Sequence, residues 1–229
     1  MLCYPVLVED TSTFSPALQE NGFQGLMGLG FDGGSIVRGV VGNGSGDTPL
    51  SRIFQLNKTT QNFISFQLDR QKDPTDTITG QITVSEFISG YESVASQPKL
   101  SVKDVPFLDT SSQHWAILTD KNGVIGPDGN AMSFDSIVPH VRGGQLVAVL
   151  DSGFTLSQVP RKMADAIYGR VQGASYSADD GAWMVPCDQQ LNISFIFGGV
   201  NMFVHPLDVA SDDFRSGNLC LGAVSILRV

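Results

Sequence analysis

One carboxylate stands where an apolar segment ends and a polar turn begins. Residues Leu146 to Leu150 form an unbroken apolar run after two glycines, and Asp151-Ser-Gly follows directly. Such a run predicts a short buried strand. An ionised carboxylate at its end needs hydrogen-bond donors or a charge partner. The hydroxyl of Ser152 can donate, and Gly153 lets another backbone come close. A carboxylate held in this way is a candidate for proton transfer, although the triplet alone is also typical of an ordinary turn.

The residues around Asp151 favour the catalytic interpretation. The apolar run, the Asp-Ser-Gly triplet, the hydroxyl-bearing segment and the helix-starting Pro160 resemble the second active-site strand and loop of pepsin-like aspartic proteases. Four other segments resemble further parts of that family: Leu26 to Gly30, Thr79 to Val84, Gln113 to Ile117 and Ala182 to Cys187. The resemblance extends from about Phe14 to Cys220 and is strongest to the fungal secreted members.

This resemblance implies a fold and a reaction. The fold is mainly β and bilobal, with residues 1–97 as a remnant of the N-terminal lobe and inter-lobe strands, and 98–229 as most of the C-terminal lobe. Members of the family hydrolyse polypeptides with two carboxylates, one from each lobe, which share a proton and activate a water. Asp151 is the implied catalytic acid, supported by Ser152, Gly153 and Thr155. No cofactor and no metal are expected.

The second carboxylate has no obvious source in the sequence. Asp10-Thr-Ser and Asp109-Thr-Ser lack the glycine of the triplet, and few residues precede the segment that resembles the strand behind the first catalytic loop. We therefore expect a product truncated at both ends, with little or no endopeptidase activity alone. Two alternatives remain: a non-catalytic fragment that binds peptides, and a homodimer that pairs two Asp151 loops. A monomer is the expected state.

One departure from the family lies in the loop itself. Phe154 stands where the family usually has a second hydroxyl residue directly after the triplet, and Thr155 comes one position later. This difference bears on how the acidity of Asp151 is tuned.

The chain has three cysteines, Cys3, Cys187 and Cys220, and no C-x-x-C pair. From the residues alone, Cys187 and Cys220 could be two buried thiols or a disulfide, which would contribute about 3–4 kcal/mol by loop-closure entropy. The family resemblance favours the disulfide and leaves Cys3 without an assigned role. Three sequons, at Asn43, Asn57 and Asn192, permit N-glycosylation if the chain is secreted.

Composition narrows the class of protein. The 229 residues carry a net charge of −9 with 41% hydrophobic and 16% charged residues, which argues against nucleic-acid binding and favours a β-rich globular fold. No apolar run approaches the roughly 18 residues of a membrane span, and no signal peptide is visible at Met1. The resemblance implies a secreted or vacuolar location for the full-length family member.

Competing motifs are weaker. Gly28 to Gly33 matches G-x-G-x-x-G, but glycines interrupt both sides and no βαβ alternation follows. A serine hydrolase would need a nucleophile elbow, which is absent, and the three histidines, His114, His140 and His205, are more typical of surface or core residues. The acidic residues after His205, which are Asp208, Asp212 and Asp213, are more typical of a solvated face than of a metal site.

Local patterns predict the elements that must position the loop. We expect a helix at 36–41 capped by Ser35, and a second helix that begins at Pro160, buries Met163, Ala166, Ile167 and Val171, and ends near Gly173. Hairpin turns are expected at Asn122-Gly and Asp128-Gly. The other expectations are strands at 3–9, within 54–68, at 79–84, at 182–187 and at 191–197, a turn at 198–199, and a short helix from Ser15 to Asn21.

Overall fold

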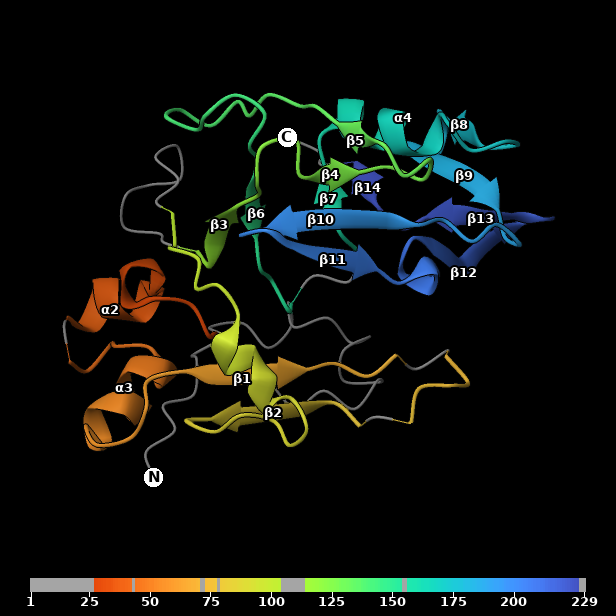
Figure 1. Cartoon of the computed structure of the whole chain (residues 1–229). Coiled ribbons are helices and arrows are strands. Elements are labelled where there is room, and N and C mark those ends of the chain that lie inside the picture. Colours follow the sequence, from red (N-terminus) through yellow and green to blue (C-terminus); the bar gives the residue numbers. More distant parts are fainter. Residues whose placement is uncertain are drawn as a thin grey trace. The chain divides into compact units, whose positions relative to one another are not determined.

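The computed structural model describes residues 27–42, 44–70, 73–77, 79–103, 114–153 and 156–226. This part of the chain is mainly β, which confirms the predicted fold class (Figure 1). It falls into two compact units that alternate along the sequence. The first unit contains described residues of 27–69 and 79–92 together with His114, and the second contains those of 70–77, 93–103 and 115–226. The predicted lobe boundary at residues 97 and 98 stays a prediction, as does the bilobal arrangement, and the predicted elements at 3–9 and 15–21 lie outside the described residues.

The first unit combines short helices with one pair of strands. Its elements are the 3-10 helix η1 (Asp32–Gly34), the helices α2 (Ile36–Val41) and α3 (Pro49–Leu56), and the antiparallel strands β1 (Ile64–Gln67) and β2 (Gln81–Val84). The Ser35 hydroxyl accepts the Arg38 N–H and so caps α2, and Gly42 ends the helix with a φ of 85°. The predicted helix at 36–41 and strand at 79–84 are confirmed.

The prediction of strands across 54–68 is wrong for its first part. Phe54 to Leu56 form the last turn of α3, which begins with Pro49 in its first turn, where the fixed φ of proline favours a helix. The Asp32 carboxylate accepts hydrogen bonds from the backbone and hydroxyl of Thr48 at 2.8 and 2.9 Å, and this fixes the residue before the helix. The strand itself begins only at Ile64.

The second unit is built from four small sheets (Figure 1). One has the order β11-β10-β4-β5, another β12-β13-β9-β8, and two are pairs, β3-β6 and the parallel pair β14-β7. The strands are β3 (Ala116–Leu118), β4 (Val124–Ile125), β5 (Ala131–Met132), β6 (Val147–Val149), β7 (Gln158–Val159), β8 (Ser175–Ser177), β9 (Ala182–Pro186), β10 (Ile193–Phe197), β11 (Val200–Val204), β12 (Ala210–Ser216), β13 (Leu219–Gly222) and β14 (Ser225–Ile226). The remaining helices are η2 (Glu92–Ser96), η3 (Pro206–Asp208) and α4 (Arg161–Tyr168). The strands predicted at 182–187 and 191–197 are confirmed as β9 and β10.

Glycine-containing turns connect the strands of the first sheet. Gly198 and Gly199 join β10 to β11 with φ values of 58° and 79°, the positive values that the tightest hairpin turns require. The Asp120 carboxylate accepts the N–H groups of both glycines, at 2.9 and 2.7 Å. The hairpin predicted at Asp128-Gly joins β4 to β5. The hairpin predicted at Asn122-Gly is wrong, because the strands before and after that turn, β3 and β4, pair with other strands.

Helix α4 supplies the centre of the core in the second unit. Met163, Ala164, Ile167 and Tyr168 are buried on it, and Val171 is buried just beyond its end. The predicted face is therefore largely confirmed. The helix ends at Tyr168 and not near Gly173, because Gly169 already closes it with a backbone hydrogen bond to Asp165.

The hydroxyl of Tyr168 connects this helix to the sheets. It donates to the Val209 carbonyl and accepts the Val224 N–H, both at 2.8 Å. Burial raises the pKa of the Tyr168 hydroxyl, which therefore stays neutral and keeps both bonds. Gly222 makes room for the ring, since a Cβ there would lie 2.8 Å from it.

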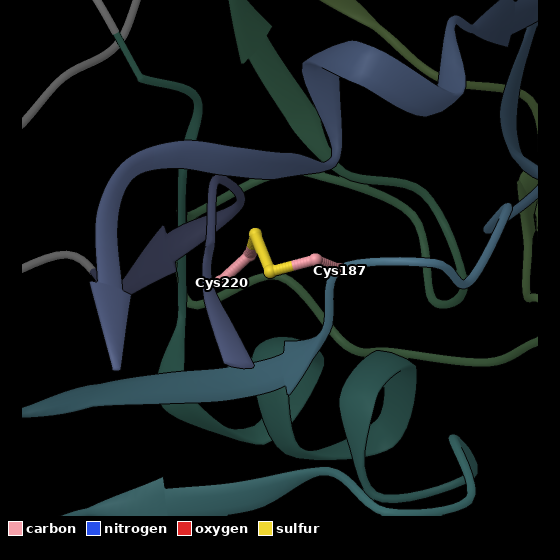
Figure 2. Close-up of a disulfide and its surroundings, with 2 residues drawn as sticks. All are labelled: Cys187 and Cys220. Carbon is pink, nitrogen blue, oxygen red and sulfur yellow. A yellow bond between two sulfur atoms is a disulfide. The ribbon is translucent and has the colours of Figure 1, made fainter. Parts of the chain in front are cut away.

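A disulfide joins Cys187, directly after β9, to Cys220 in β13 (Figure 2). The two strands are already hydrogen-bonded neighbours, with Val185 opposite Cys220. The disulfide that the family resemblance implied is thus confirmed.

Replacing Tyr168 by phenylalanine should lower the free energy of unfolding by about 1–3 kcal/mol, because it leaves the buried Val224 N–H without its acceptor, while the Val209 carbonyl keeps the Ala223 N–H as a donor. Urea denaturation would measure the change. Tyr176→Phe is the matched control: that residue stacks beneath Arg161 through its ring, 3.7 Å from the guanidinium carbon, and should change stability by less than about 0.5 kcal/mol. Equal effects of the two variants would contradict the role given to the Tyr168 hydroxyl.

Reducing the disulfide should lower the free energy of unfolding by about 3–4 kcal/mol, because the unfolded chain regains the freedom of a 33-residue loop. Denaturation of the wild type with and without reductant would measure it. A double variant, Cys187→Ala with Cys220→Ala, should have the stability of the reduced wild type and should not respond to reductant. A reductant effect of the same size in the double variant would show that another group is responsible.

Candidate active site

Strand β6 leads into the Asp151 loop, and it is less buried than its sequence predicts. The predicted run from Leu146 to Leu150 contains the strand Val147–Val149, but Val149 is 48% exposed and Leu150 is 59% exposed. The expectation of a buried strand is therefore wrong. Within the described residues β6 pairs with β3 alone, so that one neighbour covers a strand whose composition is typical of a sheet interior.

Buried polar contacts fix the start of this strand. Thr119 is 2% exposed, and its hydroxyl accepts the Leu146 N–H at 2.9 Å. The Thr119 N–H donates to the Leu146 carbonyl at 2.9 Å, and the Gln145 side chain donates to the Thr119 carbonyl at 2.9 Å. Four further residues along, the Leu150 N–H donates to the Trp115 carbonyl at 2.9 Å. The backbone is thus held on both sides of β6, up to the residue before Asp151.

The carboxylate of Asp151 is exposed and forms part of its own turn. Its Oδ1 accepts the Gly153 N–H at 2.8 Å, which closes a turn of three residues. A Cβ on Gly153 would lie 3.2 Å from that oxygen, so glycine suits the position. Ser152 is exposed as well. Its predicted support of Asp151 stays a prediction, and Phe154 and Thr155 lie outside the described residues.

The far side of the loop is also fixed in the second unit. Ser157 accepts the Ser225 N–H at 2.8 Å, and Gln158 and Val159 pair in parallel with Ser225 and Ile226. Val159 is 8% exposed and belongs to the core. The carboxylate of Asp151 therefore lies between two strands, β6 and β7, that are both held in place by hydrogen bonds.

Two of the residues considered for a metal site, His205 and Asp208, contact other charged groups instead. Arg70 donates to both carboxylate oxygens of Asp208, at 3.0 and 2.8 Å, and His205 lies 3.7 Å from the Asp73 carboxylate. The pKa of Asp73 is lowered, first by hydrogen bonds from Thr75 and further by the charges of His205 and Arg70. Among the described residues, no three His, Cys, Asp or Glu side chains gather as metal ligands would.

The G-x-G-x-x-G match at Gly28 to Gly33 lacks the long helix that should follow it. Residues around Gly28 to Gly33 form no strand in the described part, and they lead into a three-residue 3-10 helix. A dinucleotide site needs a strand before the glycines and a long helix after them.

No helix of the described part is long and apolar enough to span a lipid bilayer.

Comparison with known proteins decides the family. The chain matches the family model described as "Eukaryotic aspartyl protease" over residues 6–228. The chain belongs to the eukaryotic aspartyl protease family. This confirms the family inferred from the Asp151 loop and the surrounding segments.

Curated relatives of this aspartyl protease chain come from fungi. It is 29% identical to "Rhizopuspepsin-1" of Rhizopus niveus over 209 residues, which cover 90% of this chain and 45% of the relative. It is 29% identical to "Aspartic protease pepA" of Arthroderma otae over 118 residues, which cover 51% of this chain and 30% of the relative. Its identity to "Major aspartyl peptidase 1" of Cryptococcus neoformans is 27% over 128 residues, covering 54% of this chain and 25% of the relative. The chain thus spans less than half the length of these relatives.

The support of the loop by Thr119, Gln145 and Trp115 was not evident from the sequence. Thr119 follows a short apolar run and precedes Asp120, so it is typical of an exposed strand end. Only the pairing of β3 with β6, which brings together residues about 30 positions apart, buries its hydroxyl. No local pattern in the sequence indicates that β3 pairs with β6.

Replacing Thr119 by valine should accelerate hydrogen exchange of the amides at 146–150 and lower the free energy of unfolding by about 1–3 kcal/mol, because the Leu146 N–H loses its acceptor. Amide exchange measured by mass spectrometry tests this. Thr119→Ser keeps the hydroxyl and should leave exchange at 146–150 close to that of the wild type. Unchanged exchange in the valine variant would show that the hydroxyl does not fix β6.

Proposed function

We propose that this chain supplies Asp151 as one of the two catalytic carboxylates of an aspartic endopeptidase. The observation that carries the proposal is the exposed carboxylate in the loop after β6, in a chain that belongs to the eukaryotic aspartyl protease family. The anchoring of both ends of the loop supports it, since a catalytic group must be held in place by its own surroundings.

The chemistry requires a partner for that carboxylate. When two such groups lie close together, both cannot ionise easily, and they titrate as a unit that holds one proton. The ionised member takes a proton from water, the water attacks the peptide carbonyl, and the protonated member polarises the carbonyl oxygen. In this scheme the Gly153 N–H holds Oδ1 of Asp151 in place. The substrate is a polypeptide.

The printed sequence contains one Asp-Ser-Gly triplet and no Asp-Thr-Gly triplet. We therefore propose that the 229-residue polypeptide by itself cleaves peptides little or not at all, because it supplies one member of the catalytic pair. Ser152, Gly153 and Thr155 are the proposed supporting residues of the loop. The polypeptide alone is proposed to be a monomer, and the alternative is a homodimer that pairs two Asp151 loops.

We also propose a secreted or vacuolar location. The disulfide between Cys187 and Cys220 supports this, because such bonds form and persist in oxidising compartments and are rare in the cytosol. The net charge of −9 is consistent with a protein that stays soluble outside the cell.

Proteolysis of an unfolded protein at acid pH provides the test. The purified chain should show no more pepstatin-sensitive cleavage than its Asp151→Asn variant. A chimera in which this chain replaces the matching stretch of Rhizopuspepsin-1 would supply the missing part of a family member, and it should cleave in a pepstatin-sensitive way. Asp151→Asn in the chimera should abolish cleavage, whereas Asp179→Asn, which removes an exposed carboxylate between β8 and β9, should not.

The outcomes separate the alternatives. A chimera that unfolds cooperatively but cleaves nothing would overturn the catalytic role of Asp151 and favour a peptide-binding fragment. Cleavage by the isolated chain that rises with the square of its concentration and is lost in Asp151→Asn would point to a pair of copies. Cleavage by the isolated chain that is linear in concentration would show that a second carboxylate lies within the same polypeptide.

A further inference from the structure

The sequon at Asn57 lies in a segment that no part of the proposed mechanism uses. Asn57 follows the last residue of α3, and residues 55–62 are all exposed. Leu56, directly before it, is 87% exposed. The triplet Asn57-Lys-Thr carries the residue types that N-glycosylation requires, an asparagine and a hydroxyl residue two positions later.

The hydroxyl of this triplet is already in contact with its asparagine. The Oδ1 atom of Asn57 accepts the Thr59 hydroxyl at 2.7 Å and the Thr59 N–H at 3.1 Å. The Thr60 hydroxyl donates to the Asn57 carbonyl at 2.9 Å. Both of these donors bind the oxygen of the Asn57 amide and not its nitrogen, Nδ2. Among the described residues, no acceptor binds that nitrogen.

The turn depends on local residues alone. All three hydrogen bonds join residues two or three positions apart, so no tertiary contact is needed to form it. The same turn can therefore exist before the domain folds and after, and its exposure lets a modifying enzyme reach it in either state.

The sequon at Asn192 differs in its hydroxyl residue, Ser194, which is buried. Ser194 is 2% exposed and lies in β10, opposite Phe203 of β11 and Ile125 of β4. Once the sheet has formed, its hydroxyl is out of reach. The sequon at Asn43 begins outside the described residues. Of the two triplets that the structure describes in full, only the one at Asn57 presents both its asparagine and its hydroxyl to solvent.

We propose that Asn57 is N-glycosylated. The Asn57 Nδ2 bonds to the anomeric carbon of a glycosyl donor of the lipid-linked pyrophosphate class, the bond from that carbon to the pyrophosphate oxygen breaks, and the pyrophosphate leaves with the electron pair. Nδ2 gives up one proton to a base of the modifying enzyme. The glycan stands beside Leu56 and shields an apolar side chain that the protein leaves in water. This inference rests on the proposed secretory location and is independent of Asp151.

The test is expression of the full chain behind a secretory leader peptide in a eukaryotic host. Peptide N-glycosidase treatment in heavy-oxygen water should convert Asn57 to a labelled aspartate in a tryptic map. Asn57→Gln and Thr59→Val should each lose one glycan step on a gel, whereas Thr59→Ser, which keeps the hydroxyl, should retain it. Asn192→Gln should leave the label at Asn57 unchanged.

Alkylation of free thiols in the same samples shows whether Cys187 and Cys220 have paired. A chain with the disulfide intact and no label at Asn57 would overturn the proposal, since the compartment and the fold are then both in place. A Thr59→Val chain that keeps its glycan at Asn57 would overturn it as well. Neither outcome bears on the proteolysis of the chimera, so failure here is distinct from failure of the proposed function.

Discussion

The hydroxyl of Tyr168 is the contact on which the second unit depends. A neutral phenol buried in a protein must satisfy both its donor and its acceptor, and here the partners are the Val209 carbonyl and the Val224 N–H. Val224 directly precedes β14, the strand that pairs with β7 at the far end of the Asp151 loop. One side chain of α4 thus ties the helix to the strand that holds the proposed active-site loop. The disulfide between Cys220 and Cys187 links the same C-terminal segment to the end of β9.

Much of this fold follows from short-range chemistry that is visible in the sequence. The cap at Ser35, the glycine pair at Gly198 and the turn at Asp128 each specify a local conformation, and the structure has the expected element at each place. The Asp151 loop belongs to this class as well, because its turn is closed by a bond between residues two positions apart. The family could also be inferred from the sequence, since its motifs are short and specific.

The features that could not be predicted depend on partners distant in the sequence. An apolar run such as Leu146 to Leu150 shows that a strand is favoured, but not how many neighbours cover it, and in the described residues there is one. The helix α3 was missed because its apolar residues, Leu50, Ile53 and Phe54, also fit a strand, and the fixed start at Pro49 decided between them. The burial of Thr119 likewise arises from strand pairing across about 30 residues.

The ion pair between Arg70 and Asp208 has a consequence for the order of folding. The two residues are 138 positions apart, and closing a loop of that length costs about 4 kcal/mol of chain entropy. An exposed ion pair contributes only about 0–1 kcal/mol, so it cannot draw residues 70–77 into place before the core of the second unit exists. We infer that this segment docks late in folding and opens first under native conditions. It is the part of the second unit where partial unfolding, and cleavage by an added protease, should begin.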